Sequence, residues 1–267
     1  MRNLTVIVPV YGDWESLCEN IHHLKKHISR FSKWEVLLVN DCGPDADILE
    51  PKIKVAISGR KNFHYYRNEE NLGFVKNCNN AALKLSNQQN DIVLLNSDAL
   101  ITNKALQNMQ KVLYAKDEIG AVCPRSNSAT IFSVPMKPEA GKQYTMSESY
   151  SIYRKIRRKL PKYYISPIAH GFCMMIRRDV INKYSLFDEI YGKGYGEEND
   201  FCMRIRREGV YCAVSNKSYV FHYKARSFTE EVRSTQVDNN EKILDRRYPE
   251  YRQLIRDYVE KINETAH

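Results

Sequence analysis

The first hundred residues repeat one pattern, in which a short apolar run ends in polar residues and a helical segment follows. The runs are Leu4–Val10, 35–39, 63–66 and Asp91–Leu95, and they are rich in the β-branched and aromatic residues of buried strands. Residues 15–31 carry apolar side chains at helical spacing, and 71–85 form a second helical segment. This alternation predicts an α/β fold with a mixed, mostly parallel sheet flanked by helices.

The rest of the chain is less regular. We expect, in order, a helix over 102–120, a strand over 120–124, an irregular polar segment over 126–165, a strand over 169–177, a helix over 179–184, and short strands over 210–214 and 218–222. From residue 238 the chain is helical, with an apolar stripe that predicts docking: Tyr251, Leu254, Ile255, Tyr258 and Ile262. The predicted organisation is one domain over 1–235 with a C-terminal helical extension, 236–267, packed on it.

Composition and motifs exclude several protein classes. No segment approaches the about 18 consecutive apolar residues of a membrane span. The seven cysteines contain no CxxC pair, and scattered thiols are typical of a reducing compartment, so we expect a cytoplasmic protein. The sequence contains no GxGxxG after its first predicted strand and no GxxxxGK[ST], which excludes the usual dinucleotide loop and the P-loop.

The net charge of +9 is unevenly distributed. Six lysines and arginines lie between Arg154 and Lys162 without an acidic residue. Such a strip suits an anionic surface or ligand, and it predicts peripheral contact with the inner face of a membrane; a solvated loop is the alternative. No nucleic-acid-binding motif is present, and we expect no nucleic-acid partner.

Polar residues follow the predicted strands. In open α/β sheets, ligands bind beyond the carboxyl ends of the strands, so Tyr11, Asp13, Asp41 and Asp98 are expected to converge on one crevice. Asp98 suits a hard divalent cation shared with a diphosphate, and a turn or cap is its alternative. His222 follows a later strand, where it would complete a metal site or be structural.

Three carboxylates, Glu197, Glu198 and Asp200, lie between a Gly-Tyr-Gly loop and an arginine-rich helical segment. Acidic residues stabilise the positive N-terminal end of a helix, so in isolation they predict an acidic cap. The alternative is that one of them does chemistry.

Eight segments, in order and at similar spacing, resemble the family 2 glycosyltransferases, nucleotide-sugar enzymes with a GT-A, Rossmann-like fold. They are TVIVPVYGDWESL, VLLVNDCGPD, NEENLGFVKNCNNAAL, VLLNSDALIT, CPRSNSATI, AHGFCMMIRRDVI, FDEIYGKGYGEENDFCMRIRREG and VFHYKARSF. The resemblance runs from Leu4 to about Phe228. Within the family, the chain is similar to the subset that contains rhamnosyltransferases and other enzymes that build cell-surface glycans.

The resemblance implies roles for individual residues. Glu198 matches the catalytic base, and the acceptor side would carry Glu197, Asp200, Arg204 and His170. The nucleotide sugar would contact Pro9, Val10, Tyr11, Asp13, Asp41, Asn71, Gly73, Asn77, Asn96 and Ser97. Asp41 would hold a uracil or thymine base.

The resemblance also implies a divalent cation, Mn²⁺ or Mg²⁺, held by Asp98 and His222. Asn96 stands where the family has the first aspartate of its DxD motif, so metal binding would rest mainly on Asp98. The implied reaction is an inverting transfer of a hexosyl or rhamnosyl group from a UDP- or dTDP-sugar to a hydroxyl.

The implied acceptor is a glycan, a lipid-linked sugar or a glycoprotein, in the synthesis of a bacterial cell wall or surface polysaccharide or in protein glycosylation. A non-catalytic nucleotide-sugar-binding protein on the same fold is the alternative, which Asn96 in place of aspartate favours.

Overall fold

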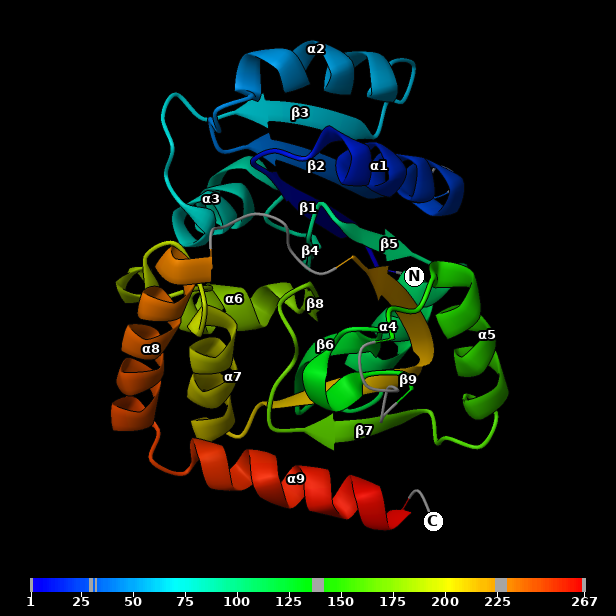
Figure 1. Ribbon diagram of the computed structural model, residues 1–267, viewed down its shortest axis with the longest axis vertical. Coiled ribbons are helices and arrows are strands. Elements are labelled where there is room, and N and C mark those ends of the chain that lie inside the picture. The colour runs from blue at the N-terminus through cyan, green and yellow to red at the C-terminus, as the bar shows by residue number, and fades with distance from the viewer. Residues whose placement is uncertain (1, 29–30, 32, 136–141, 224–229, 266–267) are drawn as a thin grey trace.

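The computed structural model describes residues 2–28, 31, 33–135, 142–223 and 230–265 (Figure 1). Its strands are β1 (Leu4–Val10), β2 (Trp34–Asn40), β3 (Phe63–Arg67), β4 (Asp91–Leu95), β5 (Ala99–Ile101), β6 (Ile119–Arg125), β7 (Tyr163–Ser166), β8 (Cys173–Ile176) and β9 (Tyr211–His222). Its α-helices are α1 (Trp14–Ile28), α2 (Ala46–Ile57), α3 (Phe74–Asn80), α4 (Ala105–Leu113), α5 (Met146–Ile156), α6 (Arg178–Tyr184), α7 (Glu197–Arg207), α8 (Glu230–Arg247) and α9 (Tyr251–Thr265). Short turns of other helix types are η1 (Ala81–Leu85), η2 (Thr130–Phe132) and η3 (Glu189–Tyr191).

The strands form one mixed sheet in the order β3-β2-β1-β4-β8-β6-β9-β5, with β7 paired to β9. Neighbours among β3, β2, β1 and β4 are parallel, as are β6 and β9. The pairs β4–β8, β6–β8, β5–β9 and β7–β9 are antiparallel. The predicted α/β fold with a mixed sheet flanked by helices is confirmed.

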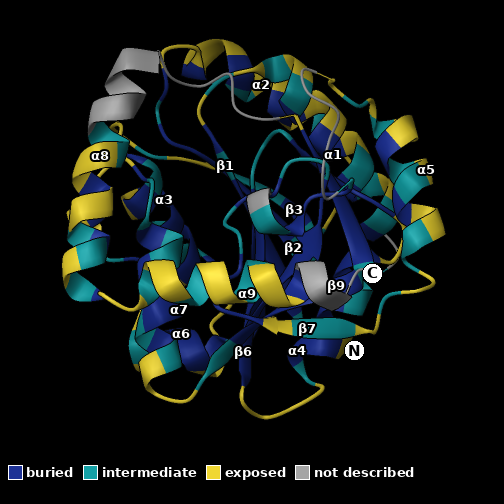
Figure 2. Ribbon diagram, turned by 60° about the horizontal axis from the view of Figure 1, so that its bottom comes forward, coloured by how far each residue is buried: buried dark blue, intermediate teal, exposed yellow. Residues whose placement is uncertain are grey.

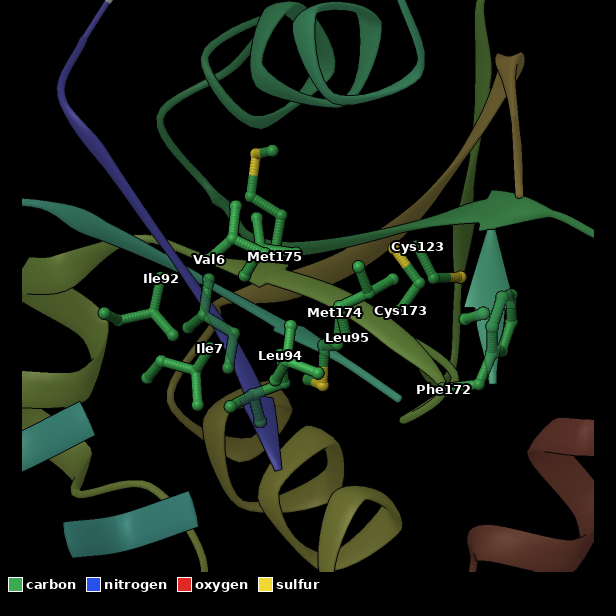
Figure 3. Close-up of a cluster of buried hydrophobic side chains, with 14 of the residues drawn as sticks. Val6, Ile7, Ile92, Leu94, Leu95, Cys123, Phe172, Cys173, Met174 and Met175 are labelled. Atoms are coloured by element: carbon green, nitrogen blue, oxygen red, sulfur yellow. The ribbon is translucent and has the colours of Figure 1, made fainter. Parts of the chain in front are cut away.

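The centre of the sheet is apolar on both faces, because helices cover both. Figure 3 shows side chains of β1, β4, β6 and β8 packed together, with Phe172 at one end of the group. On one face, α1 buries Leu17, Ile21, Leu24 and Ile28, which recur at the spacing of one helix face. Full burial of each such side chain contributes about 1.5–3 kcal/mol before the entropy of ordering it.

The segment 126–165 is more ordered than the sequence predicts. It contains α5 and β7, and α5 begins with a capping box in which Thr145 and Glu148 satisfy each other's backbone N–H groups. Tyr153 of α5 packs with Tyr219 of β9 in a second apolar cluster. The prediction of an irregular segment was wrong for α5 and β7, and in α5 serines and charged residues separate the apolar residues.

Other boundaries also differ. The helix predicted over 102–120 is confined to α4, and the strand predicted over 169–177 is confined to β8. The two strands predicted at 210–214 and 218–222 are one continuous strand, β9, with a register shift against β6. Strand β5, which follows β4 after a three-residue turn, was not predicted.

The C-terminal helices pack against α7 and the main core. Helix α8 lies beside α7, and α9 crosses below both (Figure 1). Leu244 and Tyr248 bury themselves against Met203 of α7, and Tyr251, Ile255 and Tyr258 pack on the main core. The outward face of α9 is exposed (Figure 2). The domain boundary predicted at 235 and 236 falls inside α8.

Residues 224–228, which end the VFHYKARSF segment, lie outside the described residues. Among the residues that are described, no helix is long and apolar enough to cross a membrane.

Candidate active site

The carboxyl ends of β1, β2 and β4 lie next to one another at one edge of the sheet. Val10 at the end of β1 is in register with Asn40 at the end of β2, and β4 pairs with β1 on the other side. The turns that leave these strands carry Tyr11, Asp41 and the segment from Asn96 to Asp98. Parallel pairing therefore collects them at the edge where the sequence predicts a crevice.

Asp98 and His222 come together across the β5–β9 pair. Ala99, beside Asp98, is in register with His222, and His222 Nε2 lies 3.2 Å from Asp98 Oδ1. The side chains are 10% and 17% exposed for His222 and Asp98 respectively. The contact lacks hydrogen-bond geometry, and His222 Nε2 has no hydrogen-bond partner in the described part of the chain.

This arrangement fits a divalent cation. If two ligand atoms each lie about 2.1–2.2 Å from a metal ion and the ligand–metal–ligand angle is about 90°, the two atoms are about 3.0 Å apart. The 3.2 Å separation of Asp98 Oδ1 and His222 Nε2 is close to that value, and an unpartnered nitrogen beside a carboxylate oxygen is what two ligands of one ion present. Among the described residues no group of three or more His, Cys, Asp or Glu side chains forms a metal site, so remaining ligands would come from a diphosphate and water.

Two residues that the sequence analysis did not single out hold His222. Asn127 Nδ2 donates to the His222 carbonyl and Asn127 Oδ1 accepts from the His222 N–H, both at 2.8 Å. The Phe172 ring stacks on the imidazole, with 4.9 Å between centroids. Both lie in segments quoted for the resemblance, which was the only available signal for them.

Asp41 anchors the loop that precedes α3. Its Oδ1 accepts hydrogen bonds from Asn68 Nδ2 and the Leu72 N–H, both at 2.9 Å. Its Oδ2 accepts from the Gly73 N–H at 2.8 Å. Burial raises the pKa of Asp41, and these hydrogen bonds oppose the rise. A carboxylate has about four acceptor positions, of which the described chain fills three, and Asp41 is 4% exposed.

Asn77 and Asn71 stabilise the same loop. Asn77 is buried, and its amide accepts from Asn68 Nδ2 at 2.9 Å and donates to the Val39 carbonyl at 3.2 Å. Asn71 Oδ1 accepts from the N–H of Gly73, whose φ of 80° favours glycine. Of these residues, Asn71 is exposed, whereas Asn77 contacts protein on both sides of its amide.

The residues after β1 differ in accessibility. Val10 is fully buried, Pro9 is half-buried, and Tyr11 is exposed. Asp13 caps α1, since its carboxylate accepts from the N–H and hydroxyl of Ser16 at 3.2 and 2.7 Å.

Asn96 and Ser97 form the turn between β4 and β5 and are half-buried. Buried Asn20 of α1 fixes this turn by donating to the Asn96 and Ala99 carbonyls at 3.2 and 2.7 Å. The turn therefore presents Asp98 from a rigid base.

Glu197 and Glu198 open α7 as an adjacent, electrostatically coupled pair. Glu197 is 5% exposed, and its Oε2 has no hydrogen-bond partner in the described chain. Burial and the neighbouring Glu198 raise the pKa of Glu197, which favours its protonated form. Burial also raises the pKa of Glu198, while N–H groups at the start of the helix oppose the rise.

Gly171 connects this pair to the histidines. A Cβ on Gly171 would lie 3.4 Å from Cγ of Glu198, so Glu198 packs directly against this backbone. His170 stands on one side of Gly171, and its ring meets Phe172 edge to face at 5.3 Å. Burial, reinforced by His222, lowers the pKa of His170 to about 4, which keeps its imidazole neutral. A continuous series of contacts thus runs from Glu198 to the metal-site candidate.

Asp200 and Arg204 make contacts within the protein. Asp200 is fully buried, and its Oδ1 accepts from Arg247 Nη1 at 2.9 Å and from the Tyr191 hydroxyl at 3.1 Å. Arg204 lies 3.5 Å from Asp200 Oδ2 and donates to the Tyr184 and Leu186 carbonyls. Asp200 thus joins α7 to α8, and Arg204 joins α7 to the end of α6.

The match to a known protein family follows this geometry. The model of the glycosyl transferase family 2 matches residues 5–185, more than half of the chain. The chain belongs to this family. The matched residues include strands β1, β2 and β4, whose ends form the ligand-binding edge, and also Asp98 and His170. Glu198 and His222 lie outside the matched residues.

Solved structures share the fold of this family 2 member. The mannosyltransferase PcManGT from Pyrobaculum calidifontis, in complex with GDP-Man and Mn²⁺, matches with a TM-score of 0.61 and 18% identity over 87% of this chain and 60% of its own. GalNAc-T7 with UDP, GalNAc and Mn²⁺ matches with a TM-score of 0.67 and 18% identity over 95% of this chain and 51% of its own. S. aureus TarS 1–349 matches with a TM-score of 0.57 and 17% identity over 82% of this chain and 60% of its own.

At such identities the likeness confirms the predicted GT-A-type fold and nothing finer. The family 2 chain spans 51–60% of the length of these structures. No curated protein sequence matches it.

Proposed function

We propose that this chain is an inverting glycosyltransferase that moves a sugar from a nucleoside diphosphate sugar to a hydroxyl group of a glycan or glycoconjugate. The observation that carries the proposal is the pair of Asp98 Oδ1 and His222 Nε2, 3.2 Å apart without a hydrogen bond, at the ligand-binding edge of a family 2 fold. A pair of this kind suits a diphosphate-bound Mn²⁺ or Mg²⁺.

For the donor we propose a UDP- or dTDP-sugar. The remaining acceptor position of Asp41 would receive the imide N–H of uracil or thymine, and exposed Tyr11 and Asn71 lie along the same edge. Asn77, Gly73 and the cap at Asp13 would act by holding this edge in shape. The GDP-Man in the PcManGT structure makes GDP-sugars a necessary arm of any donor test.

We propose Glu198 as the general base. Burial and Glu198 raise the pKa of Glu197, whereas N–H groups at the start of α7 oppose the rise of the Glu198 pKa, so we expect Glu198 to give up its proton more easily than Glu197. The acceptor oxygen attacks the anomeric carbon on the face opposite the diphosphate, and its proton passes to Glu198. As the new C–O bond forms, the bond to the phosphate oxygen breaks and its electron pair leaves with the nucleoside diphosphate.

A cation bound at Asp98 and His222 would supply the positive charge that makes the diphosphate a good leaving group. Neutral His170, beside Gly171, is placed to accept or donate a hydrogen bond near the reacting groups, and its Nδ1 has no partner in the described chain. Asp200 and Arg204 would support the acceptor side indirectly, by fixing α7 against its neighbours.

The cellular setting that fits is synthesis of a cell-wall or surface glycan on the cytoplasmic face of a membrane. Seven free cysteines suit a reducing compartment. Arg154 and Lys155 at the end of α5, with Lys159 and Lys162 beyond it, are exposed and would attract anionic lipid. Co-sedimentation with phosphatidylglycerol vesicles at low and high salt tests this contact, and the double change Lys155→Glu and Lys159→Glu should weaken it.

The decisive experiment supplies UDP-, dTDP- and GDP-sugars with Mn²⁺ or Mg²⁺ and measures the released nucleoside diphosphate. Turnover should appear with a uridine or thymidine donor. Glu198→Gln should lower kcat by about 100-fold or more, the usual contribution of a general base. Glu197→Gln is the matched control, since it makes the same carboxylate-to-amide change at the neighbouring position, and it should retain most activity.

Other outcomes overturn parts of the proposal. If Glu198→Gln turns over at near the wild-type rate, Glu198 is not the base. If the wild type neither transfers nor hydrolyses any donor, the chain is not a glycosyltransferase. It would then be a protein that binds nucleotide sugars without catalysis, or one that does not bind them. Asp98→Asn should raise the Mn²⁺ concentration needed for half-maximal activity and weaken Mn²⁺ binding measured by electron paramagnetic resonance.

A further inference from the structure

The corner where α7, α8 and α9 meet holds a half-open hollow of about 460 Å³. This volume lies within the range of about 300–1,000 Å³ that is usual for small-molecule sites. Its lining residues are Tyr195, Gly196, Glu198, Asn199, Val237, Asn240, Glu241, Leu244, Tyr251, Arg252, Ile255 and Arg256. All of them lie outside residues 5–185, so the family match assigns nothing to this hollow.

The hollow reaches the proposed base. Glu198 belongs to its lining and also packs against Gly171, beside His170. A molecule in the hollow would therefore present a hydroxyl to Glu198.

The walls are held in place by buried polar contacts. Asn240 of α8 is buried and donates to the Tyr191 and Gly194 carbonyls at 3.1 and 2.8 Å. Arg247 fixes α8 to Asp200 of α7 at 2.9 Å. The hollow is thus a built feature of the fold rather than a gap between loose helices.

The lining chemistry suits a carbohydrate with an acidic group. Tyr251 offers an aromatic face, and Asn199 Oδ1 has no hydrogen-bond partner in the described chain. The two arginines differ in pairing. Arg252 contacts Glu241 at 2.9 Å and Asp245 at 2.7 Å, so its charge is neutralised.

Arg256 lies one turn further along α9 and is exposed at the rim. It donates to Gln253 Oε1, and no carboxylate of the described residues lies within 4 Å of it. A guanidinium presents paired N–H donors that match a carboxylate or a phosphate. We infer that this hollow is the acceptor site and that it selects a glycan bearing an anionic group, which Arg256 recognises. The inference rests on the proposed glycosyltransferase function for its chemistry, but binding can be measured without it.

The test measures binding by saturation-transfer NMR and calorimetry, without donor. The probes are p-nitrophenyl β-glucoside, p-nitrophenyl β-glucuronide and glucose 6-phosphate. We expect the wild type to bind an acidic probe more tightly than the neutral glucoside. Arg256→Gln should weaken acidic binding about twofold to fivefold, the size of one exposed ion pair, and leave the neutral probe unchanged. The glucuronide and phosphate arms show which acidic group is preferred.

Arg246→Gln is the matched control. Arg246 is an exposed arginine on α8 that does not line the hollow, so its loss removes the same charge from the same corner of the molecule. If both variants weaken binding of the acidic probe equally, the effect comes from the overall positive charge of this region, and Arg256 does not recognise the acidic group specifically. If the neutral and acidic probes bind alike, the anionic preference is refuted. If no probe binds, the hollow is not the acceptor site, whereas donor hydrolysis by the same protein would leave the proposed function intact.

Discussion

Replacement of Asp200 by asparagine keeps a buried polar side chain at the junction of α7 and α8 but removes its negative charge. The variant therefore measures how much the buried ion pair contributes to the free energy of unfolding. Asp200 is fully buried and receives Arg247 Nη1 at 2.9 Å and the Tyr191 hydroxyl at 3.1 Å. Asparagine has nearly the same shape, but it removes the negative charge and turns one acceptor oxygen into a donor. Arg204, 3.5 Å away, then faces a neutral amide.

The size of the effect follows from these contacts. Breaking a buried ion pair by removing one partner costs about 3–5 kcal/mol. Arg247 is 35% exposed and keeps Asp188 Oδ2 at 2.8 Å, so part of its charge remains compensated. We therefore expect a loss of about 2–3 kcal/mol, which in a chain of this size lowers Tm by about 4–10 °C.

Glu250→Gln is the control, since it makes the same carboxylate-to-amide change at an exposed pair. Glu250 meets Arg207 of α7 at 3.0 Å, with both side chains about half exposed. Exposed pairs contribute about 0–1 kcal/mol, so Tm should fall by less than about 3 °C. Thermal unfolding followed by circular dichroism compares the two variants. Equal shifts, or an Asp200→Asn variant that melts with the wild type, would refute the argument from burial.

Three further changes have defined outcomes. Burial raises the pKa of Glu197 above its unfolded value of about 4.3, so its ionisation opposes folding as pH rises; Glu197→Gln should raise Tm at pH 8 and lose that gain near pH 4. Tyr114→Phe removes hydrogen bonds of 2.9 and 2.8 Å to the buried Asp91 carboxylate and should cost about 1.5–3 kcal/mol in urea unfolding; a loss below about 0.5 kcal/mol would contradict this. A Cβ on Gly43 would lie 2.0 Å from the Tyr11 carbonyl oxygen, so Gly43→Ala should displace the loop after β1 and weaken UDP binding in a thermal-shift assay, and unchanged binding would argue against a nucleotide site at this edge.

The local sequence pattern was sufficient to predict a helix or strand where the segment is apolar on both faces or has a wide apolar stripe. Strands β1 and β4 have the predicted ends, and the stripe of α9 docks as expected. The pattern failed for α5, in which serines and charged residues separate the apolar ones, and for β7, which is only four residues long. It also divided β9, because the polar residues Ser215 to Ser218 interrupt its apolar run although they are mostly buried in the sheet.

The sequence by itself determined the alternation of strands and helices, the polar residues at the strand ends, and the family to which they belong. These follow from local periodicity and from the rule that parallel strands end at one edge. The resemblance already named Asp98 and His222 together, but only the tertiary structure shows how they meet, since the antiparallel β5–β9 pairing joins two residues that lie 124 positions apart. The tertiary structure also distinguished the three carboxylates of α7 by their contacts. Residues next to one another in the sequence met different surroundings: Asp200 faces Arg247, Glu197 is enclosed, and Glu198 alone among the three lines the hollow beside Gly171.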